Sequence, residues 1–116
     1  MSRKKEFETF RTALNEIILE QKTNREIKRF FALDTRAYAE GALSSKVKEL
    51  LGLVASMTLR CNDCISYHII QCHELGVNEE EFYEAFNVAL IVGGSIIIPH
   101  LRQAVALLEE IYEGEK

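Results

Sequence analysis

Two cysteines three residues apart, followed by a histidine, form the most reactive segment of the sequence, CNDCISYH at residues 61–68. Cysteines at this spacing can form a disulfide or share a metal ion. The segment opens a predicted helix, where unpaired N–H groups and the helix dipole lower the pKa of a thiol. His68 follows Cys64 by four residues and so falls on the same helical face. An imidazole placed there can accept the thiol proton or hold the thiolate, which predicts thiol chemistry.

Other interpretations of this segment stay open at the level of sequence. A free cysteine is often only a small buried hydrophobe, and this is our interpretation of Cys72, which has no partner at close spacing. His68 could also be a hydrogen-bonded core histidine, with the two cysteines of the pair acting alone.

Zinc binding is a further alternative. Structural zinc takes four ligands, usually from two separated pairs, and the sequence has no second CxxC and no HxxxH. Cys61 and Cys72 would lie about 16 Å apart along one helix, so one helix cannot wrap an ion with both. A site completed by Glu49, His100 or a second subunit remains open, but we predict no metal and no cofactor.

Composition limits the remaining possibilities. The chain has 116 residues, a net charge of −4 and a pI near 5.4, which favours one domain over residues 1–116 and argues against nucleic-acid binding. The longest apolar stretch, residues 88–98, is broken by glycines, whereas a membrane-spanning helix needs about 20 apolar residues. The first residues do not resemble a signal peptide. We therefore expect a cytoplasmic protein that binds neither membranes nor nucleic acid.

Apolar residues recur at helical spacing along the chain and predict an all-α fold of six helices. The cysteine pair is expected at the start of a central helix that ends at Gly76. We interpret residues 96–99 as the beginning of a last, buried helix ending at Tyr112, because a lone strand would have no partner. Capping residues predict three further helix starts, at Thr23 with Glu26, at Ser44 or Ser45, and at Asn78 with Glu81.

The pattern E-x11-C-x2-C-x3-H, which begins at Glu49, resembles the AhpD-like (alkylhydroperoxidase) branch of the carboxymuconolactone decarboxylase family. Residues 43–50 and 73–77 around it also resemble that branch, and the similarity covers roughly residues 30–111. The resemblance implies an AhpD-like helical domain with redox-active cysteines. The decarboxylase branch lacks the CxxC pair, so a lyase is a less suitable alternative.

The resemblance also implies roles for individual residues. Cys64 would attack a hydroperoxide and become a sulfenic acid, and Cys61 would donate a proton and close a Cys61–Cys64 disulfide. Glu49 would orient or charge His68, which activates Cys64. Well-known hydroperoxidases of this branch carry a second histidine just before the second cysteine, where this chain has Asp63, whose carboxylate opposes thiolate formation.

Partners follow partly from the resemblance and partly from the residues. The apolar stretch at residues 88–98 needs more cover than so small a monomer offers, which predicts a homo-oligomer. The resemblance implies a trimer or hexamer, a hydroperoxide or other small oxidised substrate, and a dithiol or lipoylated protein as electron donor. The rival hypotheses are a metal- or ligand-binding oligomer without turnover and a scaffold with incidental cysteines.

The predicted helices leave one geometric difficulty. Glu49 lies about 16 Å of helix before the turn that ends at Arg60, whereas His68 follows that turn closely. We therefore expect an oblique helix crossing, a kink or a neighbouring subunit to bring the two side chains together.

Overall fold

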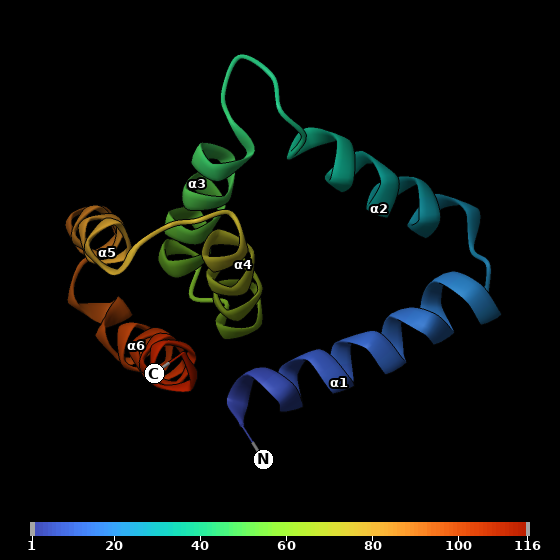
Figure 1. Ribbon diagram of the computed structural model, residues 1–116. Coiled ribbons are helices and arrows are strands. Elements are labelled where there is room, and N and C mark those ends of the chain that lie inside the picture. Colours follow the sequence, from blue (N-terminus) through green and yellow to red (C-terminus); the bar gives the residue numbers. More distant parts are fainter. Residues whose placement is uncertain (1, 116) are drawn as a thin grey trace.

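The computed structural model describes residues 2–115, and every regular element in that range is helical (Figure 1). The six α-helices confirm the predicted all-α class, and Cys61 directly precedes the fourth of them. The elements are α1 (Arg3–Glu16), a π-helical turn (Ile17–Gln21), α2 (Arg25–Ala37), α3 (Ser45–Thr58), α4 (Asn62–Glu74), α5 (Glu79–Gly93), a 3-10 turn (Ser95–Ile97) and α6 (Ile98–Gly114).

Two of the predicted helix starts are confirmed by their capping bonds. Ser44 Oγ accepts the Val47 N–H at 3.1 Å at the start of α3. Asn78 and Glu81 exchange side-chain to backbone bonds of 2.9 Å at the start of α5, which is a capping box. Local hydrogen bonding in the sequence therefore sets where these helices begin.

The predicted bounds of the second helix are wrong. Asn24, not Thr23, is its N-cap, and Asn24 Oδ1 accepts the Ile27 N–H at 3.0 Å. Thr23 has a φ of 52° and so cannot take the extended conformation that an N-cap requires. The helix ends at Ala37 and is followed by Tyr38, rather than reaching Gly41.

Helices α3 to α6 pack into a bundle around an apolar core. The contacts of α3 with α4 and α5, and of α4 with α6, hold this bundle together. The predicted bounds of the last helix, residues 96 to 112, are partly wrong: α6 starts at Ile98 and runs to Gly114, because residues 95–97 form a separate 3-10 turn. Ile97 in this turn is fully buried beneath Gly93. A Cβ on Gly93 would lie 2.9 Å from Ile97 Cγ2, so glycine permits this close approach. The largest fully buried apolar side chains are Phe82, Phe86, Leu53, Met57, Ile65, Ile69, Ile97 and Leu108.

Helices α1 and α2 form an arm beside the bundle (Figure 1). The start of α1 is anchored to α6, because the Glu110 carboxylate accepts the backbone N–H groups of Arg3 and Lys4. Helix α2 has no buried residue, and Phe30 and Leu33 on it are more than half exposed. None of the described helices is both long and apolar enough to cross a membrane.

Candidate active site

A buried ion-pair-like contact joins α3 and α4. His68 Nδ1 lies 2.7 Å from Glu49 Oε2, and both side chains are almost completely buried. A carboxylate can only accept, so Nδ1–H donates, and this fixes the imidazole tautomer. The other ring nitrogen, Nε2, is left to act as a base. The structure thus brings together two residues that are far apart in the sequence.

The contact forms within one chain, so the neighbouring subunit considered above is not needed. Gly52 and His68 lie the same number of residues from the facing ends of α3 and α4 and meet across the hairpin. Glu49 lies one helical turn before Gly52, farther from the loop of the hairpin and on the same face of α3. Its side chain is long enough to extend over that turn and reach His68. The length of the Glu49 side chain thus removes the mismatch expected from the sequence.

Gly52 makes room for the histidine. A Cβ at this position would lie 2.6 Å from His68 Cε1 and 2.7 Å from the Tyr38 hydroxyl oxygen, closer than real Cβ atoms come. Glycine in the middle of a helix costs stability relative to alanine. We infer that glycine occurs here despite this loss of stability because any larger residue would prevent the imidazole from packing against α3.

Two tyrosines enclose the imidazole. The rings of Tyr38 and Tyr67 lie 5.6 and 5.2 Å from the His68 ring, centroid to centroid. Burial, reinforced by the negative charge of Glu49, raises the pKa of both phenols above the ordinary value. Both hydroxyls therefore stay protonated at neutral pH. The guanidinium carbon of Arg11, on α1, lies 4.1 Å from the centroid of the Tyr67 ring, so a side chain of α1 also packs against this group of rings.

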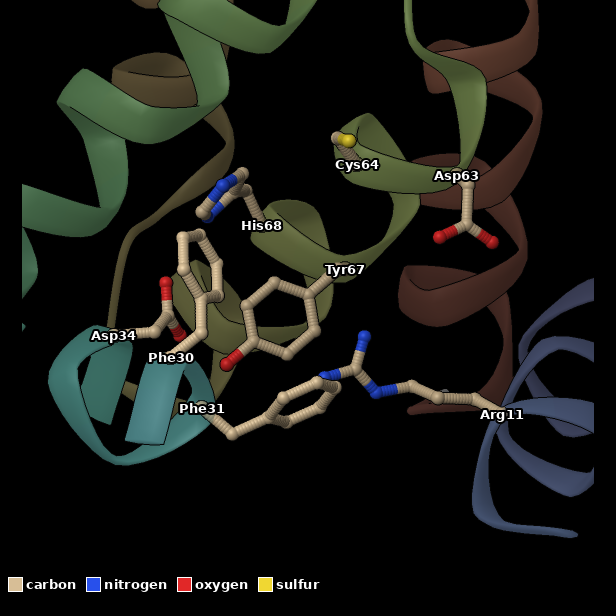
Figure 2. Close-up of a pocket in the computed structure, with 8 residues that line it drawn as sticks. All are labelled: Arg11, Phe30, Phe31, Asp34, Asp63, Cys64, Tyr67 and His68. Atoms are coloured by element: carbon tan, nitrogen blue, oxygen red, sulfur yellow. The ribbon is translucent and has the colours of Figure 1, made fainter. Parts of the chain in front are cut away.

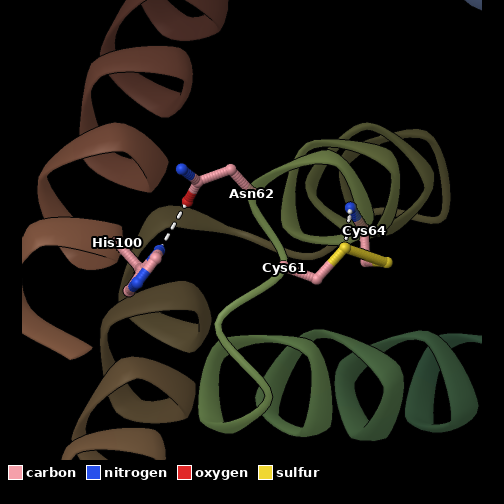
Figure 3. Close-up of a disulfide and its surroundings, with 4 residues drawn as sticks. All are labelled: Cys61, Asn62, Cys64 and His100. Carbon is pink, nitrogen blue, oxygen red and sulfur yellow. Dashed lines mark hydrogen bonds between the residues drawn. A yellow bond between two sulfur atoms is a disulfide. The ribbon is translucent and has the colours of Figure 1, made fainter. Parts of the chain in front are cut away.

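The cysteine pair occupies the start of α4, as predicted, and is present as a Cys61–Cys64 disulfide with a Cα–Cα distance of 5.3 Å. Cys61 is the N-cap, and its Sγ accepts the Cys64 N–H at 3.2 Å (Figure 3). The two cysteines differ in environment, because Cys64 is exposed and Cys61 is half-buried.

A cavity of about 360 Å³ opens beside Cys64 and His68 (Figure 2). Its walls come from α1, α2 and α4, so the arm and the bundle build it together. Glu49 stands behind His68, and Cys61 is not among the lining residues. The cavity is lined by Arg11, Phe30, Phe31, Asp34, Asp63, Cys64, Tyr67 and His68.

Two other residues considered from the sequence, His100 and Cys72, lie outside this cavity. His100 is on α6, where its Nδ1–H donates to Asn62 Oδ1 at 2.8 Å and holds the turn between the cysteines (Figure 3). Cys72 is fully buried, and burial, together with the charge of Glu49, raises the pKa of its thiol to about 12. Within residues 2–115, no three His, Cys, Asp or Glu side chains are arranged to hold a metal ion.

Sequence reasoning missed several residues of this site: Tyr38 and Gly52 beside the imidazole, and Arg11, Phe30, Phe31 and Asp34 in the cavity lining. A usable signal existed for Gly52, because a glycine inside a helix, three residues after Glu49, indicates a close approach on that face. Tyr38 and Arg11 carried no such signal, since their contacts depend on where the arm lies.

The fold and the site define an all-helical protein with a cysteine pair at a helix start and a buried His–Glu pair behind it. The chain belongs to the carboxymuconolactone decarboxylase family, which it matches over residues 27–110.

Relatives of the chain include proteins of known structure. It is similar to a carboxymuconolactone decarboxylase family protein from Thermotoga maritima with a suggested part in an antioxidative response, at 51% identity and a TM-score of 0.88 over 95% of this chain and 92% of that one. A family protein from Legionella pneumophila, in its apo form, is 27% identical with a TM-score of 0.76 over 98% of both chains. An uncharacterised protein of the cox locus of Paracoccus denitrificans is 30% identical over 82 residues, 71% of this chain and 74% of that protein.

Replacing Gly52 with alanine tests whether α3 positions the histidine. The added methyl overlaps the imidazole, so Gly52→Ala should break the His68–Glu49 bond while the helical circular dichroism is kept. The measurement is NMR of the His68 ring, whose hydrogen-bonded Nδ1–H resonance should disappear. Gly114→Ala is the matched control, because an added Cβ there meets open space. An unchanged His68 resonance in Gly52→Ala would contradict this role of Gly52.

Proposed function

We propose that the protein is a thiol-disulfide oxidoreductase that reduces hydroperoxides with the Cys61–Cys64 pair. The observation that carries this proposal is that Cys64 and His68 line one cavity, while Glu49 fixes His68 from behind. A reactive sulfur, a base and a space for a small substrate therefore meet at one place.

His68 is suited to activate Cys64. Its Nδ1–H is engaged by Glu49, so Nε2 is the nitrogen that can take the thiol proton. The imidazolium formed in this way is stabilised by the carboxylate of Glu49, which is buried and therefore weakly screened. The start of α4 favours the resulting thiolate as well.

The proposed reaction has two steps. The Cys64 thiolate attacks the outer oxygen of the hydroperoxide, the O–O bond breaks, and the alkoxide leaves with a proton from Cys61. Cys64 is then a sulfenic acid, and the Cys61 thiolate attacks its sulfur. A disulfide forms and hydroxide leaves, which a proton from His68 converts to water. The substrate gains two electrons and the two thiols lose them.

Asp63 lines the cavity beside Cys64, where its negative charge opposes thiolate formation. Arg11 lines the same cavity and partly offsets this charge. The suggested antioxidative role of the Thermotoga maritima relative supports a peroxide-reducing function for this chain as well. We propose a dithiol or a lipoylated protein as electron donor and the cytoplasm as the location.

We also propose that the chain is a homo-oligomer, a trimer or a hexamer. A groove of about 620 Å³ between α3 and α5 is walled mainly by apolar side chains, among them Leu51 and Val88. Val92, at its edge, is 69% exposed, and its neighbour Ile91 is 87% exposed. Apolar surface of this kind, continuous over two helices, is typical of a subunit interface.

Peroxide treatment of the reduced protein tests the redox proposal. The wild type should form a Cys61–Cys64 disulfide, whereas Cys61→Ser should accumulate sulfenic acid on Cys64, because the resolving thiol is missing. Mass spectrometry with a sulfenic-acid trapping reagent measures both products. Cys72→Ser is the control and should behave as the wild type. Unmodified thiols together with stoichiometric bound metal would instead favour the metal-binding hypothesis.

Alkylation rates test the proposed relay. In the reduced protein, Cys64 should react with iodoacetamide at pH values well below about 8.5, the pKa of a free thiol. His68→Ala and Glu49→Ala should each slow this reaction about tenfold or more, because the thiol loses its base or the base loses its counter-charge. Cys72, with a pKa raised to about 12, should stay unmodified and serves as the internal control. Equal rates in the wild type and both variants would rule out the relay.

Sedimentation velocity at micromolar concentration tests the assembly. The wild type should sediment as a species well above the 13.3 kDa of one chain. Ile91→Asp should shift it toward the monomer, because the new charge would be buried at the interface. Lys22→Glu changes an exposed charge in the link between α1 and α2, outside the groove, and should leave the assembly intact. A wild-type protein that is only monomeric would contradict the proposal.

A further inference from the structure

The two sulfurs of the disulfide occupy unlike environments. Cys64 is exposed and lines the cavity, so a molecule in the cavity can reach its sulfur. Cys61 is half-buried, lies outside the cavity lining, and its Sγ accepts the Cys64 N–H at 3.2 Å. One sulfur is thus accessible, and the other is held by a backbone donor at the helix start (Figure 3).

These differences bear on how the disulfide is reduced. In thiol–disulfide exchange, a thiolate attacks one sulfur and the other leaves as a thiolate, so groups that stabilise negative charge on the leaving sulfur speed the reaction. A hydrogen bond from a backbone N–H and the positive end of a helix both stabilise a thiolate. The accessibility of Cys64 and the stabilisation of negative charge on Cys61 therefore both favour attack on Cys64, with Cys61 as the leaving sulfur.

We propose that the electron-donating thiol enters the Cys64 cavity, attacks Cys64 Sγ and expels Cys61. This inference rests on the proposed redox function and names the sulfur at which the donor reacts. A donor thiolate forms a new S–S bond to Cys64 while the Cys61–Cys64 bond breaks, and its electron pair leaves with Cys61 Sγ. A second donor thiol then attacks the donor sulfur of this mixed disulfide, and Cys64 leaves as a thiolate.

The second exchange returns Cys64 to the side of His68. The leaving thiolate forms in the cavity that His68 also lines, so a charged imidazole can stabilise it there. Cys61, meanwhile, takes up the proton that it donates in the next reaction with hydroperoxide. Both halves of the cycle then use one cavity: Cys64 attacks the hydroperoxide in the first half and is attacked by the donor in the second, with Cys61 as its internal partner.

Trapping the mixed disulfide tests the direction of attack. The Cys72→Ser protein, which has only the two relevant thiols, is oxidised with diamide, so that disulfide formation does not depend on peroxide turnover. It is then mixed with 2-mercaptoethanol, quenched in acid and labelled with N-ethylmaleimide. This neutral thiol is chosen because the carboxylates of Asp34 and Asp63 line the cavity and repel an anionic one.

Fragmentation mass spectrometry between residues 61 and 64 locates the two labels. Mercaptoethanol should be found on Cys64 and maleimide on Cys61, in about tenfold excess over the reverse pattern. The same reaction in guanidinium chloride is the control and should lose this preference, because the helix start and the cavity are gone.

Equal labelling in the folded protein, or mercaptoethanol mainly on Cys61, would overturn the inference. If the donor adduct is on Cys64 but the reduced protein leaves hydroperoxides intact, the peroxidase proposal alone is wrong. Failure of diamide to form the Cys61–Cys64 disulfide would contradict both the direction of attack and the proposed redox function.

Discussion

The hydrogen bond between His68 and Glu49 is the interaction on which the candidate site depends. It joins α3 to α4 in the interior, at 2.7 Å, and both side chains are almost completely buried. A buried carboxylate without a partner would be costly, so the pairing constrains how the two helices pack. Gly52 supplies the room, and the rings of Tyr38 and Tyr67 pack against the imidazole. The proposed base is therefore held at the wall of the cavity by the protein itself.

The start of α4 complements this arrangement. Cys61 is at the N-cap, where its sulfur accepts the backbone N–H of Cys64. Cys64, in the first turn of the helix, lines the cavity. From α6, His100 holds Asn62 between them, so the turn is supported by a third helix. The cysteines are thus an asymmetric pair, one facing the substrate and one facing the protein, and the proposed cycle uses this asymmetry in both directions.

The helices of the bundle, the cysteine pair and His68 could be proposed from local patterns, because helix caps and i,i+4 spacing are local, whereas Glu49 entered only through the resemblance to the family. The contact between Glu49 and His68 could not be derived in this way, since it depends on the register of a helical hairpin and the reach of one side chain. The start of α2 was misplaced by one residue because the left-handed backbone of Thr23 leaves no mark in the capping pattern. Arg11 and Tyr38 join the site only through the position of the arm, which short-range patterns do not encode.

The most direct test of the central claim is the stoichiometry of a single turnover. Reduced protein, freed of excess reductant, is mixed with a small excess of an organic hydroperoxide, and the remaining peroxide and free thiols are counted. The account predicts that each chain consumes one equivalent of hydroperoxide, releases one equivalent of alcohol and loses two thiols, and that Cys64→Ser consumes none. A hydroperoxide concentration that stays constant over the fully reduced wild type would contradict it.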